Sequence, residues 1–253
     1  MNSTLPQEMQ SHTYPLMYEV EGSHWWYVGR RLILESFLRE IIQNPKSKIQ
    51  NPKILDVGCG TGANLEMLAQ FGEAAGVDVS SDALEFCRKR GLSEVKQGLA
   101  ENLPFETESF DLVTALDVVE HLDDDLSGLR EMHRVLKKNG QTLIFVPAFM
   151  FLWGVQDDVS HHRRRYTRKQ IVSQLEKTGF KVERATYANI MFFAPILFGR
   201  ALMKLTGYKP ASENNLTVSS LNGFLGQLFG AERFWLKNTN LPFGVSIVVV
   251  ARK

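Results

Sequence analysis

A short apolar run that passes directly into a glycine-rich turn constrains this chain more than any other feature. The segment KILDVGCGTG, residues 53–62, places Gly58, Gly60 and Gly62 immediately after the run. Open α/β sheets bind ligands at the carboxyl ends of their strands, and glycines there let the backbone approach a ligand closely. The segment therefore predicts a strand at 53–57 that leads into a ligand-binding turn.

Apolar runs and helical patterns alternate through most of the chain. Strands are predicted at 53–57, 74–79, 94–98, 110–116, 142–146, 181–189 and 246–253, and helices at 63–71, 81–90, 126–137 and 168–178. Strands that alternate with helices of this length form right-handed βαβ units. We therefore expect an α/β fold: a Rossmann-like, doubly wound, mostly parallel seven-stranded sheet.

The two ends of the chain are expected to add helices to this sheet. We divide the chain into an N-terminal helical lid (1–51, with an amphipathic helix at 31–43), a core (52–189), an apolar helical insertion (190–240) and a final strand of the core sheet (241–253). Pro195 and Gly199 argue against one straight helix at 190–205. The insertion either forms a lipid-facing or membrane-surface element, or caps the sheet and buries the face of a homodimer.

Composition excludes several classes of protein. There are 29 Lys and Arg residues against 28 Asp and Glu residues, a net charge of +1, which gives no strong field for nucleic acid. The cysteines, Cys59 and Cys87, form neither a disulfide framework nor a zinc pattern, which favours a reducing, cytoplasmic location. The most apolar run, 190–198, is far shorter than the roughly 20 residues of a membrane span.

Two carboxylates accompany the glycine turn. Asp56, which precedes the turn, either holds a cationic amine of the ligand or braces the N–H groups of the turn. Asp78 follows Gly58 by twenty residues (78 − 58) and ends the second strand, where an acid can accept both hydroxyls of a ribose. Alternatively, Asp78 caps the helix that starts near Ser81.

The turn alone does not separate the enzyme classes that bind nucleosides. The dinucleotide fingerprint is G-x-G-x-x-G, whereas this turn is G-x-G-x-G with Ala63 three residues past Gly60, which a variant fingerprint tolerates. An NAD-dependent dehydrogenase therefore remains an alternative at this point.

Three further segments, together with the glycine turn, carry a specific resemblance. The segments GLAENLPFETESFDLV, TALDVVEHLDDD and EMHRVLKKNGQTLIFVP follow the glycine turn in the order and spacing found in class I S-adenosylmethionine-dependent methyltransferases. The chain resembles that family from about residue 52 to residue 179. The resemblance implies S-adenosylmethionine as cofactor, with S-adenosylhomocysteine as product, and a cofactor site made of Asp56, Gly58, Cys59, Gly60, Gly62, Asp78, Val79, Ala100, Glu101 and Leu116.

One residue departs from the family pattern. Leu99 stands where the family often has an Asp that accepts from the adenine amino group, so Glu101, a backbone carbonyl or water is expected to replace it. HWWYVGRR and PAFMFLWGVQDDVSHHRRRYT resemble a type 11-like bacterial subgroup, some members of which look like partners of glycan or lipid assembly pathways. No Asn-Pro-Pro-Tyr tetrad follows the fourth strand, and no nucleic-acid-reading domain is evident, which disfavours nucleic acid as acceptor.

Methyl transfer from a sulfonium needs alignment and exclusion of water more than a fixed set of catalytic groups. The candidates for a general base are His121, after the fourth strand, and a group after the fifth strand: Asp157, Asp158, His161, His162 and Tyr166. Each histidine alternatively belongs to the rim or the surface. The acids and histidines show no helix-spaced ligand pair, so the sequence predicts no metal site.

Basic and aromatic residues are the candidates for acceptor binding. Arg163 and Arg165 suit an anionic acceptor, or else pair with Asp157, Asp158 or the acids at 123–125. Trp25, Trp26 and Arg30 either form a lid over the cofactor or plug the sheet. The sequence thus predicts an enzyme that methylates an O, N or C atom of a small-molecule or lipid-linked acceptor; the alternative from another class is a non-catalytic cofactor-binding partner subunit. The sequence is also compatible with a peripheral contact between the protein and the inner face of a membrane.

Overall fold

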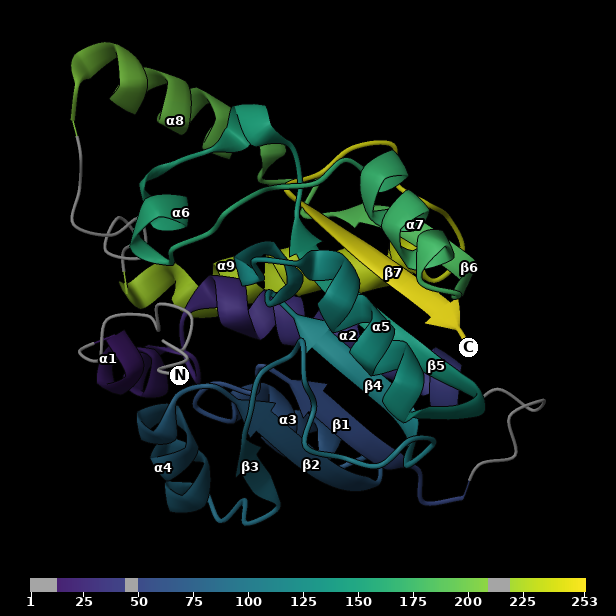
Figure 1. Ribbon diagram of the computed structural model, residues 1–253. Helices are drawn as coiled ribbons and strands as arrows, with labels where there is room; N and C mark the ends of the chain where they lie inside the picture. Colours follow the sequence, from purple (N-terminus) through teal and green to yellow (C-terminus); the bar gives the residue numbers. More distant parts are fainter. Residues whose placement is uncertain (1–12, 44–49, 209–218) are drawn as a thin grey trace.

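A single mixed sheet forms the centre of the computed structural model (Figure 1). The structure describes residues 13–43, 50–208 and 219–253, and within them seven strands run in the order β3-β2-β1-β4-β5-β7-β6. The strands are β1 (Lys53–Val57), β2 (Glu73–Asp78), β3 (Val95–Gln97), β4 (Phe110–Leu116), β5 (Leu136–Pro147), β6 (Lys181–Ala188) and β7 (Ser246–Arg252). All neighbours are parallel except β7, which is antiparallel to β5 and β6. The predicted fold class is confirmed.

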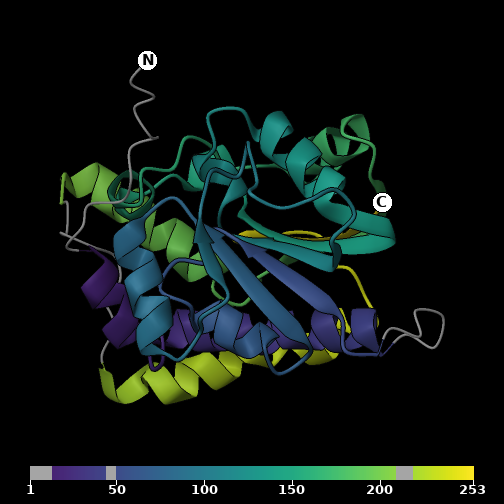
Figure 2. The same ribbon diagram turned by 60° about the horizontal axis from the view of Figure 1, so that its bottom comes forward.

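Helices cover both faces of the sheet (Figure 2). One face carries α2 (Trp25–Ile42) and α3 (Ala63–Leu68), and the other carries α5 (Asp125–Val135) and α7 (Arg168–Lys177). The remaining helices and short 3₁₀ turns are α1 (Thr13–Val20), α4 (Ser81–Lys89), η1 (Val119–His121), η2 (Met150–Leu152), α6 (Val155–Val159), α8 (Phe193–Thr206), η4 (Ser219–Leu221), α9 (Asn222–Gly230) and α10 (Glu232–Leu236). Fully buried apolar residues of α2 and the central strands form the core.

The insertion predicted at 190–240 divides between two places. Its second half, α9, packs along the outer side of α2 (Figure 2), and glycines permit the close approach. A Cβ on Gly29 of α2 would lie 2.5 Å from the Phe229 ring, and one on Gly230 would lie 2.4 Å from Leu32. The first half, α8, buries none of its residues fully. Residues 209–218, between them, lie outside the described part, as do 1–12 and 44–49 of the predicted lid.

The boundary between α5 and β5 differs most from the sequence prediction. The helix predicted at 126–137 ends at Val135, and β5 begins at Leu136 rather than at Thr142. Asn139, with φ of 64°, and Gly140 form a bulge within β5 where the register against β4 shifts. Asn139 adopts the left-handed backbone that is common at a bulge, and the Asn-Gly pair does not mark the helix end that the sequence suggested.

The first long helix begins earlier than the amphipathic pattern indicated. The helix α2 starts at Trp25, and the ring of His24 caps it by accepting from the backbone N–H of Trp26 at 3.4 Å. The prediction that Pro195 and Gly199 break the helix after β6 was wrong. Pro195 occupies the third position of α8, in the first turn, where its missing N–H costs no helical hydrogen bond.

Candidate functional site

One cavity of about 1060 Å³ opens at the carboxyl ends of β1, β2, β4 and β5. The strand order reverses between β1 and β4, and such a switch point is where open α/β sheets bind ligands. Most of the site residues expected from the sequence line this cavity: Trp25, Trp26, Arg30, Gly58, Cys59, Gly60, Asp78, Val79, Ala100, Glu101, Leu116, His121, His161, His162, Arg163 and Arg165. Asp56, Gly62 and Tyr166 are not part of the lining.

The glycine turn after β1 is held against β2 by backbone hydrogen bonds. The N–H groups of Gly58 and Cys59 both donate to the carbonyl oxygen of Val77, at 2.8 and 3.0 Å. Gly60 adopts a φ of +54°, and a Cβ built on it would meet no atom within 4 Å. The backbone at Gly60 is therefore bare toward the cavity, so a ligand can approach it directly.

Asp78 links this turn to the end of β2. One carboxylate oxygen accepts from the backbone N–H of Gly60 at 2.8 Å, and the other accepts from that of Ser80 at 2.9 Å. The helix cap that the sequence offered as an alternative for Asp78 is supplied by Ser80, whose side chain accepts from the N–H of Ala83. Asp78 therefore sits on the cavity wall as an oriented carboxylate.

Asp56 lies beneath the turn and is almost fully buried. Its carboxylate accepts a hydrogen bond of 2.7 Å from the Thr114 hydroxyl, while its second oxygen has no hydrogen-bond partner among the described residues. Burial raises the pKa of Asp56 to about 7. The hydrogen bond of Asp56 therefore joins β1 to β4, and not to the N–H groups of the turn as one of the two sequence interpretations had it.

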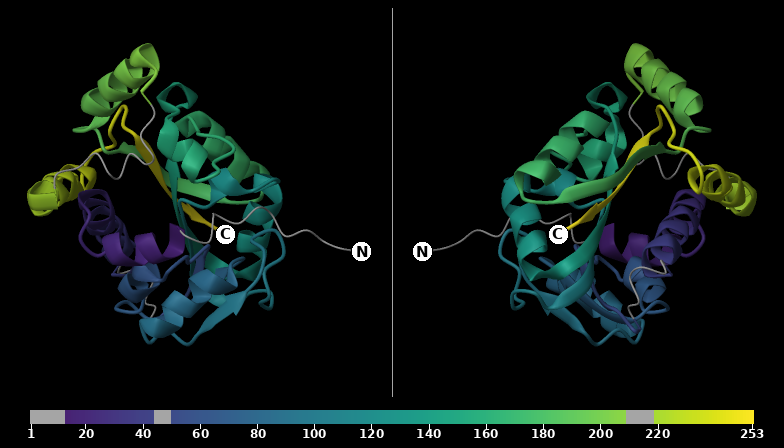
Figure 3. Two further views of the ribbon diagram at one scale, coloured as in Figure 1. Left: turned by 90° about the vertical axis from the view of Figure 1, so that its left-hand side faces the viewer. Right: turned by 90° about the vertical axis from the view of Figure 1, so that its right-hand side faces the viewer.

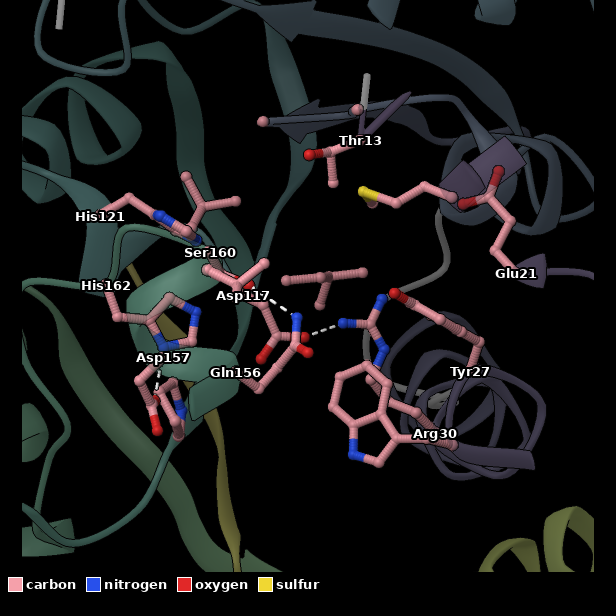
Figure 4. Close-up of a pocket in the computed structure, with 18 of the residues that line it drawn as sticks. Thr13, Glu21, Tyr27, Arg30, Asp117, His121, Gln156, Asp157, Ser160 and His162 are labelled. Atoms are coloured by element: carbon pink, nitrogen blue, oxygen red, sulfur yellow. Dashed lines mark hydrogen bonds and ion pairs between the residues drawn. The ribbon is translucent and has the colours of Figure 1, made fainter. Parts of the chain in front are cut away.

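A charged pair that the sequence pattern did not reveal also lines the cavity. Arg30 of α2 forms an ion pair with Asp117, which follows β4, and donates to the side-chain oxygen of Asn64 at 2.9 Å. Figure 4 shows the guanidinium of Arg30 pointing into the cavity toward Asp117. Asp117 has a φ of 61°, a strained backbone of the kind found at ligand sites. In the sequence, the position of Asp117 directly after an apolar strand is the one sign that it belongs to a site.

The N-terminal helices are attached to the glycine turn. Glu21, between α1 and α2, accepts a short hydrogen bond from the Thr61 hydroxyl and pairs with Arg90 at 2.5 Å. Residues of helix α1 contribute to the lining of the cavity. Trp26 stacks over Arg30, with the guanidinium carbon 5.0 Å from the ring centroid. Trp25 contacts Phe192 instead, with ring centroids 4.6 Å apart.

Two histidines from different loops meet in another part of the cavity lining. The rings of His121, in η1, and His162, after α6, lie edge to face with centroids 4.7 Å apart. Asp157 contacts Nδ1 of His162 at 2.8 Å, and Figure 4 shows His162 between Asp157 and His121. Burial lowers the pKa of His121 to about 3, so its imidazole is neutral. Glu120, next to His121 in η1, is fully buried.

The basic run after α6 is mostly engaged with acids. Arg163 pairs with Asp123 at 2.7 Å, and Arg165 pairs with Asp157 at 2.7 Å. Arg165 is 5% exposed and also donates to the carbonyl oxygens of Ala148 and Val245. The ion pairs offered as the alternative to anion binding are therefore present, and the Arg165 guanidinium holds the loop in place.

Tyr166 is removed from the candidate bases. It is 3% exposed, and its hydroxyl donates to Asp125 at 2.8 Å rather than facing the cavity. Burial raises the pKa of this hydroxyl above its usual range. His161, by contrast, lines the cavity with a backbone φ of 54°.

The last wall of the cavity is apolar. Pro195, Ile196, Gly199 and Met203, spaced along one side of α8, contribute to the lining together with Arg200. The other side of α8 is exposed, including Phe198 at 71% and Leu205 at 86%. The cavity thus runs from the bare glycine turn to an apolar helix that is open to its surroundings.

Known proteins share this sequence pattern over the core. A family model described as a methyltransferase domain matches residues 55–144. An uncharacterized methyltransferase of Bacillus subtilis is 28% identical over 183 residues, which are 67% of this chain and 71% of that protein. A demethylmenaquinone methyltransferase of Chlorobaculum parvum is 38% identical over 101 residues. That alignment covers 39% of this chain and 42% of the enzyme, so the chain spans less than half of that relative.

The fold extends the similarity to nearly the whole chain. A solved S-adenosylmethionine-dependent methyltransferase from Thermotoga maritima superposes with a TM-score of 0.56 and 21% sequence identity. The match covers 96% of this chain and 100% of that one. At this identity the match describes the fold, including the helices outside the matched domain.

Proposed function

Since the chain is a class I S-adenosylmethionine-dependent methyltransferase, we propose that it methylates a small lipid-linked acceptor held in the same cavity as the cofactor. The observation that carries this proposal is the continuity of the cavity, which joins the glycine turn, the two histidines and the apolar side of α8. Ligand pockets commonly measure about 300–1000 Å³. A cavity of about 1060 Å³ therefore has room for a nucleoside cofactor and an acceptor together.

The nucleoside half of the cofactor fits the wall made by the glycine turn and β2. The bare backbone at Gly60 can lie against the ligand, and the Asp78 carboxylate can accept from the ribose hydroxyls. Val79, Ala100 and Glu101 continue the wall and would contact the adenine. When bound, S-adenosylmethionine supplies an electrophilic methyl group and leaves as a neutral thioether.

The amino-acid half of the cofactor fits the charged end of the cavity. Arg30 and Asp117 are opposite charges that face each other there, and Asn64 adds an amide beside them. A methionyl end carries one carboxylate and one ammonium group, so we assign the carboxylate to Arg30 and the ammonium to Asp117. Arg30, which the sequence suggested for the acceptor, then orients the cofactor.

The chain's own groups then align the acceptor and exclude water. We assign the methyl group to the side of the cavity where His121 and His162 meet, because both histidines line the cavity and their rings lie edge to face. Helix α1 and Trp26 close the cavity on the side of the cofactor. An in-line displacement gains most of its rate from such positioning. A histidine within reach can also take a proton from an acceptor hydroxyl.

Helix α8 supports a lipid-linked rather than an anionic acceptor. The helix stands away from the central sheet (Figure 3). Its apolar residues line the cavity on one side and are exposed on the other, which suits an acceptor with an apolar tail that extends out of the cavity. Arg163 and Arg165 already pair with carboxylates, so they offer little to an anion. The demethylmenaquinone methyltransferase relative fits an acceptor of this kind.

The test supplies the full chain with S-adenosylmethionine labelled in its methyl group, together with the aqueous and lipid fractions of a cell extract. We expect label in the lipid fraction. Ile196→Ser, in the cavity wall, should reduce that label, whereas Phe234→Ser, at an exposed position of α10 outside the cavity, should not. Label confined to water-soluble products would refute the lipid-linked acceptor, and no transfer to either fraction would refute the function.

The same exposed face suggests a peripheral contact with a membrane. No helix within residues 13–43, 50–208 and 219–253 has the length and apolar character needed to cross a bilayer. We propose that Phe198, Leu202 and Leu205 instead lie at the lipid surface. In a sedimentation assay with phospholipid vesicles, the chain should pellet with the vesicles. Phe198→Ser should reduce the fraction of the chain in the pellet. A homodimer through the same face would instead appear as a doubled mass in solution.

A further inference from the structure

A buried carboxylate and two histidines converge on the acceptor side of the cavity. Glu120 and His121 end the short turn η1 after β4, and His162 follows α6. One ligand atom of each residue lies within 4.8 Å of those of the other two. Nε2 of His162 is 3.9 Å from an oxygen of Glu120. Residues that are distant in sequence thus present one oxygen and two nitrogens to a common point.

Glu120 has no partner that explains its burial. It is 0% exposed, and neither carboxylate oxygen has a hydrogen-bond partner among the described residues. A buried carboxylate without hydrogen bonds or a counter-ion is strongly unfavourable. The nearby cations Arg30 and Arg165 are already paired with Asp117 and Asp157. The carboxylate is therefore left for a proton or for a further cation.

His162 is held in the tautomer that a metal ligand needs. The carboxylate of Asp157 accepts from Nδ1 at 2.8 Å, so the lone pair of the neutral ring is on Nε2, toward Glu120. Asp157 is itself fixed by Arg165 and by the backbone N–H of Gly154 at 2.8 Å. A carboxylate behind a histidine is the usual outer support of a metal-bound imidazole.

We propose that Glu120, His121 and His162 bind a divalent transition-metal ion, such as Zn²⁺, on the acceptor side of the cavity. Two imidazoles and one carboxylate, with further positions open to a substrate, form a common ligand set for such ions. Ligand atoms at about 2.1 Å from Zn²⁺ stand roughly 3.4 Å apart in a tetrahedron. The present spacing of up to 4.8 Å exceeds this by about 1.4 Å (4.8 − 3.4), so the three side chains would have to draw together around the ion.

The role of the ion rests on the proposed function. An acceptor hydroxyl that binds the ion loses its proton to solvent more readily, because the ion stabilises the oxyanion. The acceptor oxygen then forms a bond to the methyl carbon as the bond from that carbon to sulfur breaks. The products are a methyl ether and neutral S-adenosylhomocysteine, so charge and atoms balance. The proposal therefore favours O-methylation of a hydroxyl-bearing acceptor.

The test measures metal binding by the full chain without any acceptor. After treatment with a chelator and dialysis, the chain is titrated with Zn²⁺ by calorimetry and with Co²⁺ by absorption spectroscopy. We expect one ion per chain and visible Co²⁺ bands of a nitrogen and oxygen ligand field. Glu120→Gln, which preserves side-chain size, and His162→Gln should each weaken Zn²⁺ binding at least tenfold. His161→Gln, at the neighbouring position outside the cluster, should leave Zn²⁺ binding unchanged.

Two results would overturn the metal site. One is the absence of stoichiometric Zn²⁺ binding and of Co²⁺ bands in the wild-type chain, a measurement that holds even if a variant fails to fold. The other is equal binding by wild type, Glu120→Gln and His162→Gln. Titration with S-adenosylhomocysteine under the same conditions separates this outcome from a failure of the proposed function, because cofactor binding at Asp78 does not involve the cluster.

Discussion

Asp78→Asn is the substitution that tests the cofactor wall most sharply. The carboxylate of Asp78 accepts from Gly60 and Ser80, and in the proposed complex it also accepts from the ribose. The amide keeps the size of the side chain but replaces one acceptor oxygen with a donor and removes the charge. A hydrogen bond to a charged group contributes about 1.5–3 kcal/mol. Its loss corresponds to a Kd roughly 10- to 150-fold higher, at about 1.4 kcal/mol per factor of ten.

The assay is calorimetric titration of the folded variant with S-adenosylhomocysteine. Asp82→Asn is the matched control, because Asp82 is an exposed aspartate one turn further along, in α4. We expect the control to bind like wild type. Circular dichroism before titration shows whether the variant keeps its helices and sheet. A folded Asp78→Asn variant with a Kd within threefold of wild type would falsify the assignment of the ribose to Asp78.

Three further predictions concern stability. Burial raises the pKa of Asp56 to about 7. Between about pH 4 and pH 7 the native chain therefore holds a proton that the unfolded chain has released, so the free energy of unfolding falls as the pH rises. Asp56→Asn should remove the contribution of Asp56 to this pH dependence, which is up to about 4 kcal/mol between urea melts at pH 4 and pH 8, and an unchanged pH slope would contradict this. Gly29→Val should destabilise the chain by about 1–3 kcal/mol, because its Cβ would overlap Phe229; a thermal melt identical to that of wild type would refute the close packing of α2 and α9. Arg165→Met should lower the urea-derived stability by about 3–5 kcal/mol, since it leaves Asp157 buried beside an uncharged side chain; a loss below 1 kcal/mol would show that the pair is not structural.

The sheet and the cofactor wall follow from local sequence. The apolar run before Gly58 and the acid at the end of the next strand are patterns of residues close together in the sequence. Such patterns predict the two strands, and the carboxyl ends of parallel strands lie on one edge of the sheet. The bulge at Asn139 was missed because an Asn-Gly pair is equally typical of a turn, and only pairing with β4 decides between them. The early start of α2 was missed because the His24 cap is an unusual one.

The cluster around Glu120 shows a different limit. His121 and the histidine pair at 161–162 follow β4 and β5, so their presence on one edge was predictable from topology. Their convergence was not, because it depends on the helical turn α6 and on the buried pair of Asp157 and Arg165. A search for ligand pairs at helical spacing overlooks ligands that come from two separate loops.

The most direct test of the account is a crystal structure of the chain with S-adenosylhomocysteine. We predict the ribose hydroxyls within hydrogen-bond distance of the Asp78 carboxylate, the amino-acid end between Arg30 and Asp117, and the sulfur facing His121 and His162. A nucleoside bound outside this cavity, or a sulfur turned away from both histidines, would contradict it.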